Sequence, residues 1–256
     1  MRRRYCFFDY DGTLRSRSLD AVPASAHAAL DNLRENGHFV ALATGRLQSD
    51  ALEVLAPCGI DTMVADGGNS VTIDGKLISI EGMPLEPSRA FAHRLDDEGW
   101  AWAVNCENAR TCLTRDERYA SLVTHLYYTP VVDPALDIDM VDPIYKIFVP
   151  CKRGEEQAID FTGVTWARYS DELIYIEPTD KSRGIRKMMK LLDAPIEDVI
   201  VFGDGTNDID MFRPEWTSVA MGNAVPELKE RADLVTSSVD DDGIWNACVK
   251  LGLIKG

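Results

Sequence analysis

The sequence lacks the cysteine and histidine patterns that hold zinc or a network of disulfides. Its six cysteines are scattered without a Cys-x-x-Cys pair, and its four histidines are isolated from one another. These spacings exclude zinc-finger and thioredoxin-like motifs. Cys6 and Cys248 lie among apolar neighbours, which predicts small buried side chains and a reducing cytoplasm as the compartment.

Long apolar runs are also missing. No stretch approaches the roughly 18 consecutive apolar residues of a membrane-spanning helix. The apolar segment Tyr5–Phe8 follows three arginines but stops at Asp9, which is too short for the apolar part of a signal peptide. No internal repeat or low-complexity segment is evident. We therefore expect a cytoplasmic globular protein without a membrane partner.

Positive charge is scarce. The sequence contains 27 basic and 42 acidic residues, which gives a net charge of −15. This charge argues against nucleic acid and anionic membranes as general partners. An anionic substrate would need a local positive site or a bound cation to overcome it. The 256 residues allow one large α/β domain, or a core with an inserted module.

Both ends of the chain alternate short apolar runs with helical patterns. The run from His38 to Ala43 is nearly continuous, as in a strand buried on both faces. Alternating strands and helices predict a parallel sheet with right-handed crossovers. The elements expected here are strands 5–8, 38–43, 62–65, 199–202, 218–221 and 233–236, helices 25–36, 47–56, 181–192, 208–212 and 241–251, and a hairpin of strands 71–73 and 77–80.

The middle of the chain predicts adjacent strand pairs, which are typical of an antiparallel α+β module. The fold class expected is therefore α/β, with a Rossmann-like core formed by residues 1–82 and 181–256 and an inserted α+β cap formed by residues 83–180. The elements expected in the cap are helices 87–98, 116–126 and 154–161, strands 100–104, 110–114, 145–149, 164–168 and 172–176, and a loop at 129–143 rich in proline and aspartate.

Two aspartates one residue apart, Asp9 and Asp11, directly follow the first strand and precede Gly12. At the carboxyl end of a parallel strand they would enter the crevice where open α/β sheets bind ligands. Asp-Gly alone would favour a simple turn. An Asp-x-Asp-Gly-Thr sequence that ends an apolar strand is much more specific for a functional site.

Two further strands end in polar residues. Thr44-Gly45-Arg46 follows one, although Thr44 alone could be only a helix N-cap. Gly203–Asp208 follows another; a calcium loop is excluded there because Ile209 replaces the turn glycine and a strand leads in. Arg46 could contact substrate or form a salt bridge with Asp208. Three such strand ends facing one crevice indicate one site.

These residues resemble the motifs of the haloacid dehalogenase superfamily over essentially the whole chain. The segment Asp9–Thr13 resembles the first motif, Thr44 the second, Lys181 the third and Gly203–Asp208 the fourth. Thr44-Gly45-Arg46, the insertion after the third strand and the segment Ala220–Ala224 resemble the Cof-type branch (subclass IIB), whose characterised members are mostly phosphatases. Asp66-Gly67-Gly68 departs from the Asn-Gly-Ala that is common there.

The resemblance implies a role for each matching residue. Asp9 would be the nucleophile that forms an aspartyl-phosphate, and Asp11 the general acid and then base. Mg²⁺ would be held by the Asp9 side chain, the Asp11 backbone carbonyl and Asp204, with Asn207 or Asp208 in support. The residues implied to bind substrate or its phosphate are Thr44, Gly45, Arg46, Lys181 and Asn207. By itself, Lys181 could equally be a solvated lysine at a helix start.

The function expected is that of a Mg²⁺-dependent phosphatase acting on small phosphomonoesters, such as sugar phosphates, with the cap selecting the substrate. Two alternatives remain. A phosphotransferase or phosphomutase would use the same aspartyl-phosphate but pass it to a hydroxyl group. A phospho-ligand-binding protein would keep the fold without turnover, which the intact set of motif residues makes the weaker alternative.

Overall fold

The computed structural model describes residues 2–124 and 127–255. The chain divides into two compact units. The first unit consists of Met1–Arg46, Ala51–Ser79 and Asp180–Gly256, and the second of Leu47–Asp50 and Ile80–Thr179. In the described part of the chain, no helix combines the length and apolar character needed to cross a membrane.

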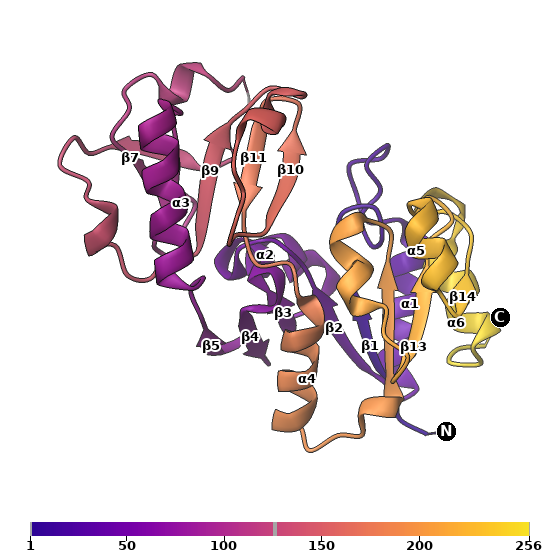
Figure 1. The fold of residues 1–256 in the computed structure, drawn as a ribbon. Helices are drawn as coiled ribbons and strands as arrows, with labels where there is room; N and C mark the ends of the chain where they lie inside the picture. The colour runs from indigo at the N-terminus through magenta and orange to yellow at the C-terminus, as the bar shows by residue number, and fades with distance from the viewer. Residues whose placement is uncertain (1, 125–126, 256) are drawn as a thin grey trace. The chain divides into compact units, whose positions relative to one another are not determined.

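The first unit is built on an eight-stranded sheet with the strand order β14-β13-β12-β1-β2-β3-β4-β5 (Figure 1). The strands from β14 to β3 pair in parallel, and β4 then pairs antiparallel to β3. The strands are β1 (Tyr5–Phe8), β2 (Phe39–Ala43), β3 (Met63–Ala65), β4 (Ser70–Ile73), β5 (Lys76–Ile80), β12 (Val199–Gly203), β13 (Thr217–Ala220) and β14 (Leu234–Val235). The parallel core expected from the sequence is confirmed.

Helices cover this sheet. Helix α1 packs against β2 and α6, whereas α4 packs against β3 and β4 and lies in front of the sheet in Figure 1. The helices are α1 (Ala24–Glu35), α2 (Gln48–Leu55), α4 (Lys181–Leu191), α5 (Pro226–Arg231) and α6 (Gly243–Lys250), with 3₁₀ turns η1 (Ala56–Cys58), η2 (Asp66–Gly68), η6 (Ile196–Asp198), η7 (Thr206–Met211) and η8 (Val239–Asp241).

Aromatic packing fixes the two central strands just before their polar ends. In the parallel register Phe8 pairs with Phe202, and the two rings stack with centroids 4.4 Å apart. Both side chains are fully buried. Such a ring pair contributes about 0.5–1.5 kcal/mol beyond the burial of its area. This packing therefore fixes the backbone just before Asp9 and Gly203, the next residues along the chain.

The second unit is a six-stranded sheet with the order β10-β11-β9-β6-β7-β8. Its helix α3 (Leu85–Glu98) packs on one face, where Phe91 and Leu95 join a core with Val104, Ile147 and Ile174. The strands are β6 (Ala103–Asn105), β7 (Thr111–Thr114), β8 (Thr129–Val132), β9 (Lys146–Pro150), β10 (Trp166–Ser170) and β11 (Leu173–Ile176), and the 3₁₀ turns are η3 (Tyr119–Ser121), η4 (Ile138–Met140) and η5 (Glu155–Ala158).

Several elements differ from the sequence prediction. Strand β8 lies inside the segment 129–143 expected to be a loop, and it pairs in parallel with β7. Its pair of β-branched valines suits a strand, and Pro130 is tolerated because β8 is at the sheet edge. Helix α5 was not expected, although Pro226 at its first turn is a typical start signal.

Two helices expected in the second unit are 3₁₀ turns instead. Within the predicted helix 116–126 the described residues form only η3, and residues 125–126 lie outside the described part. The Thr124 N–H donates to Glu172 Oε2 at 2.7 Å, so a side chain replaces the helical carbonyl partner. Similarly, the Gly154 N–H donates to Glu156 Oε2 at 2.6 Å, and the predicted helix 154–161 shrinks to η5. The predicted helix 208–212 is likewise the 3₁₀ turn η7.

Candidate active site

Three neighbouring parallel strands, β12, β1 and β2, each end in a polar residue of the first unit. Asp204 follows β12, Asp9 follows β1 and Thr44 follows β2. All three side chains are buried. Because parallel strands end at the same edge of the sheet, the three groups meet where α/β sheets bind ligands.

Lys181 joins this edge from the first turn of α4. Its side chain is only 1% exposed, and its Nζ donates to Asp9 Oδ1 and Asp208 Oδ1, each at 2.5 Å. A solvated lysine is therefore excluded. Within the described residues, Asp9 Oδ2 has no hydrogen-bond partner. One oxygen of Asp9 is thus held by an ammonium group while the other is available for chemistry.

A tight turn after β3 fixes both the start of α4 and the loop after β2. A Cβ on Gly68, which has a φ of +106°, would lie 2.0 Å from the Asp180 carbonyl oxygen, so only glycine allows this approach. In the same turn the Asp66 N–H donates to the Arg46 carbonyl at 2.8 Å, and the Gly67 N–H to the Thr44 carbonyl at 3.1 Å. Asp66 itself has a φ of 51°. The segment that departs from the family pattern therefore positions the loop at Thr44 through its backbone.

The buried carboxylates shift one another's protonation. Burial, followed by the nearby Asp208 charge, raises the pKa of Asp9 to about 8, although Lys181 opposes the shift. Burial and Asp208 likewise raise the pKa of Asp204 to about 6. For Lys181, burial lowers the pKa, but the Asp208 and Asp9 carboxylates outweigh it and leave the pKa raised. The edge of the sheet thus carries more negative charge than its one lysine neutralises.

The donor set fits a hard divalent cation. Carboxylate oxygens of Asp9, Asp204 and Asp208 all lie within 4.8 Å of one another, and all three residues are buried. Asp204 Oδ1 accepts from Thr13 Oγ1 at 2.8 Å, which orients the carboxylate. Oxygen ligands of this kind are those that Mg²⁺ prefers. A Cβ on Gly12 would lie 2.2 Å from Asp204 Oδ2, so the glycine keeps this space open.

The other predicted ligands are engaged differently. The Asp11 backbone carbonyl accepts from Arg17 Nη2 at 3.1 Å, which places a guanidinium beside this predicted metal ligand. Asp208 Oδ2 accepts from the backbone N–H groups of Asp204 and Gly205, both at 2.9 Å. Asp208 therefore shapes the loop after β12 as well as facing Lys181. The Asn207 side chain is exposed.

Asp11 is held by arginines. Arg46 donates to it through Nε at 2.9 Å and Nη2 at 3.0 Å, and Arg15 adds a bond through Nη1 at 3.1 Å. The prediction for Arg46 left open a substrate contact or a salt bridge to Asp208; the structure gives it Asp11 as an ion-pair partner. Gly45 lies between Thr44 and Arg46 and is partly buried.

Sequence reasoning placed Thr13 in the first motif without giving it a role, and it missed Arg15 and Arg17. Asp11 and Arg15 are four residues apart, a spacing that indicates an ion pair only on a helix, whereas this segment is a loop. Asn223 belongs to the segment Ala220–Ala224 that resembles the Cof-type branch. Its side-chain amide donates to the Gly12 carbonyl at 2.8 Å and accepts from the Val239 N–H at 2.9 Å, which ties two loops together.

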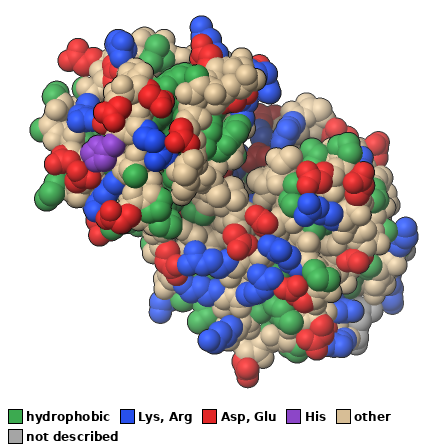
Figure 2. All heavy atoms as spheres, viewed as in Figure 1, with side chains coloured by type: hydrophobic (Ala, Val, Ile, Leu, Met, Phe, Trp, Pro, Cys, Tyr) green, Lys and Arg blue, Asp and Glu red, His purple; other side chains and the backbone are tan. Residues whose placement is uncertain are grey.

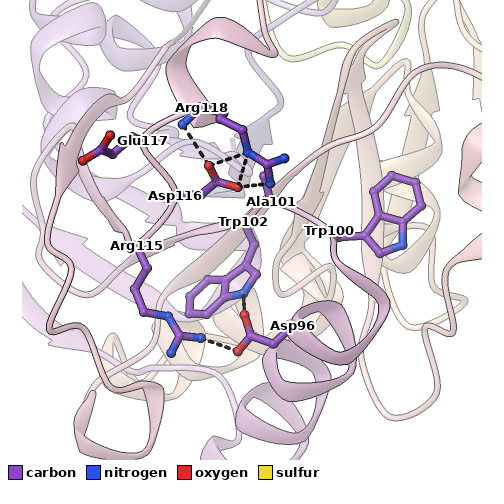
Figure 3. A pocket seen from close by; sticks show the side chains of 8 residues that line it. All are labelled: Asp96, Trp100, Ala101, Trp102, Arg115, Asp116, Glu117 and Arg118. Atoms are coloured by element: carbon purple, nitrogen blue, oxygen red, sulfur yellow. Dashed lines mark hydrogen bonds and ion pairs between the residues drawn. The ribbon is translucent and has the colours of Figure 1, made fainter.

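The second unit contains a hollow of about 330 Å³, lined by three acidic residues and two arginines, in which each arginine pairs with an aspartate (Figure 3). Asp96 accepts from Trp102 Nε1 at 2.8 Å and also pairs with Arg115. Arg118 pairs with Asp116. On the visible face of each unit, acidic and basic side chains are interspersed rather than gathered by sign (Figure 2).

Comparisons with known proteins agree with this geometry. Residues 6–248 match the family of haloacid dehalogenase-like hydrolases. YkrA of Bacillus subtilis, provisionally named a phosphatase, is 31% identical over 100% of both chains. A hypothetical protein of Geobacillus kaustophilus has a solved structure with a TM-score of 0.82 and 32% identity, covering 98% of this chain and 100% of that one.

A subclass IIB sugar phosphatase, BT4131, is also structurally similar. Its TM-score is 0.78 with 25% identity, and the match covers 98% of this chain and 100% of that one. The family match spans nearly the whole chain, and the expected α/β architecture is present. The chain therefore belongs to the haloacid dehalogenase-like hydrolases, in the Cof-type branch that its motifs resemble.

Proposed function

We propose that this hydrolase is a Mg²⁺-dependent phosphatase that cleaves small phosphomonoesters through an aspartyl-phosphate on Asp9. The observation that carries the proposal is the buried edge of the sheet, where Asp9 accepts from Lys181 and lies close to the carboxylates of Asp204 and Asp208. A site for an anionic ester at this place needs added positive charge. Mg²⁺ held by Asp9 and Asp204, with Asp208 in support, would supply that charge when bound.

The chain's own groups account for the reaction in two steps. Asp9 Oδ2 attacks phosphorus, the ester P–O bond breaks, and Asp11 gives its proton to the departing oxygen. In the second step Asp11 takes a proton from water as the water oxygen attacks phosphorus, and phosphate leaves from Asp9. Lys181 and the Thr44 hydroxyl are the groups we assign to the phosphoryl oxygens, where negative charge builds up.

Small phosphorylated metabolites are the proposed substrates, and sugar phosphates are the first class to test because BT4131 is described as a sugar phosphatase. We assign the choice among them to the second unit, since it carries none of the residues given to the phosphoryl group. All six cysteines are free thiols, which supports the cytoplasm as the compartment.

The experiment measures phosphate release from a panel of phosphorylated metabolites, with Mg²⁺ or with EDTA, for the wild type and Asp9→Asn. We expect release to require Mg²⁺ and to fall by a factor on the order of 10⁴ or more in the variant, as when other covalent nucleophiles are removed. Asp198→Asn is the matched control, because Asp198 is also a buried aspartate of the first unit but pairs with Arg4.

Release that survives Asp9→Asn would show that Asp9 is not the nucleophile, and release that survives EDTA would refute the metal requirement. If the wild type consumes esters without releasing phosphate, products formed with added sugar acceptors would identify a phosphotransferase. Ligand binding without turnover would indicate a non-catalytic protein.

A further inference from the structure

The carboxylate of Asp11 is held in a charged clamp made by Arg46 and Arg15. Arg46 bonds both of its oxygens, Nε to Oδ2 at 2.9 Å and Nη2 to Oδ1 at 3.0 Å. Arg15 bonds Oδ1 as well, at 3.1 Å. A guanidinium that contacts both oxygens fixes the plane of a carboxylate as well as its position.

Arg46 is itself fixed by contacts other than those with Asp11. Its backbone N–H donates to Thr44 Oγ1 at 3.1 Å, and its carbonyl accepts from the Asp66 N–H at 2.8 Å. Its guanidinium lies 5.1 Å from the centre of the Tyr10 ring, and this tyrosine is buried. Cation–π contact and backbone bonds together make Arg46 a firm support.

Asp11 needs such a support because its own surroundings hold it less firmly than those of Asp9. The Asp11 side chain is 34% exposed, whereas that of Asp9 is 7% exposed. Asp11 lies in the loop that leads from β1 to α1, where an isolated bridge to Arg15 is the local pairing. Without Arg46 the carboxylate could turn toward solvent and away from a departing ester oxygen.

We propose that Arg46 is a positioning residue that orients Asp11 for proton transfer, and that it does not bind the phosphoryl group; this inference rests on the proposed phosphatase function. When the bond from Asp9 to phosphorus forms, the ester P–O bond breaks and its electron pair stays on the departing oxygen. That oxygen takes the proton of Asp11. Arg46 then holds the carboxylate that results, in the orientation required for accepting a proton from water.

The test compares two esters of similar size, phenyl phosphate and p-nitrophenyl phosphate, with the intact Mg²⁺-loaded enzyme. Phenolate is a poor leaving group that needs a proton, whereas p-nitrophenolate leaves without one. We expect Arg46→Ala to lower kcat/KM for phenyl phosphate roughly a hundredfold, within the usual range for general acid catalysis, and to lower it only about threefold for p-nitrophenyl phosphate. Arg46→Lys should restore part of the loss for phenyl phosphate.

Arg186→Ala provides the matched control. Arg186 also pairs with a carboxylate, that of Glu215, and also lies over an aromatic ring, 5.3 Å from the centre of Trp216. It belongs to the same unit but not to the proposed site. Arg186→Ala should lower the unfolding temperature about as much as Arg46→Ala and leave the ratio of kcat/KM for the two esters unchanged.

Equal losses for both esters in Arg46→Ala would overturn the inference, because a group that binds the phosphoryl oxygens acts regardless of the leaving group. An unchanged rate for both esters would overturn it too. If the wild type releases phosphate from neither ester nor from any metabolite in the panel, the proposed function fails instead. The two failures are therefore distinguishable.

Discussion

Buried charges are balanced in the second unit and unbalanced in the first. In the second unit the Lys146 side chain is 2% exposed and pairs with Glu177. In the first unit the equally buried Lys181 pairs with two carboxylates, those of Asp9 and Asp208. The carboxylate of Asp204 lies close to both and completes the group that could hold a metal ion. The buried ammonium group thus pairs with Glu177 in the second unit and with two carboxylates of a cluster of three in the first.

The difference separates structure from function. A buried ion pair is roughly neutral for stability when both partners are present, so the pair in the second unit needs no further explanation. A surplus of buried carboxylates costs folding free energy, and a fold optimised only for stability would not keep it. The surplus in the first unit matches the charge of a divalent cation, and it lies at the strand ends where the chemistry is expected.

Among the variants that test this contrast between the units, the largest effect is expected from replacing each of the two buried lysines with methionine. Lys181→Met should lower phosphate release by about 10³-fold, because a preorganised charge at the phosphoryl oxygens is lost. Lys146→Met should destabilise the protein by about 3–5 kcal/mol, because Glu177 is left buried without its partner. Its kcat/KM for p-nitrophenyl phosphate should stay within a few-fold of wild type. Denaturant unfolding and steady-state kinetics measure both.

The double variant Lys146→Met/Glu177→Gln is the control for this comparison. It removes both charges of the pair and should regain most of the lost stability. Should Lys146→Met abolish turnover while the protein remains folded, the balanced pair would also belong to the catalytic machinery. The contrast between the units would then be wrong.

Two glycines with positive φ, one in each unit, provide a second test of the difference between the units, with a smaller expected effect. Gly12, with a φ of +100°, would place an added Cβ 2.2 Å from Asp204 Oδ2, whereas Gly99, with a φ of +76°, has nothing within 4 Å of an added Cβ. Gly99→Ala should cost about 1–2 kcal/mol for the left-handed backbone alone. Gly12→Ala should cost more, and should also lower activity and Mg²⁺ affinity. An equal loss of stability in the two variants would show that the Asp204 carboxylate moves away from the added Cβ without a free-energy cost.

The third expected effect is that the free energy of unfolding of the EDTA-treated protein depends on pH. The folded-state pKa values of Asp9 (about 8) and Asp204 (about 6) lie above the ordinary value of 3.8. The folded state therefore binds more protons than the unfolded state between about pH 4 and pH 8, so the free energy of unfolding falls as the pH rises through this range. We expect a loss of a few kcal/mol, measured by denaturant unfolding at each pH.

Asp204→Asn should flatten this pH profile and stabilise the metal-free protein at about pH 8, where the wild-type carboxylate is ionised. Mg²⁺ at about 100 times its Kd should add about 2.7 kcal/mol to the wild type but much less to the variant. A metal-free protein that gains stability as the pH rises through this range would contradict the surplus of buried carboxylates.

The sequence by itself determined the parallel core, the order of the polar strand ends and the family. Each of these depends on local patterns: Asp9 and Asp11 follow an apolar strand directly, and Asp204 follows another, so chain direction alone brings them to one edge. Periodicity also indicated helix α4, which begins at Lys181.

Only the tertiary structure decided which partners these groups have. The clamp on Asp11 joins residues 35 positions apart, and the burial of Lys181 depends on α4 packing against the turn after β3. The predicted helix after Asp116 failed for the same reason, because Glu172 captures the N–H of Thr124 from a distant part of the chain. The local sequence determines on which strand, helix or loop a side chain lies. Its partner depends on segments that only folding brings together.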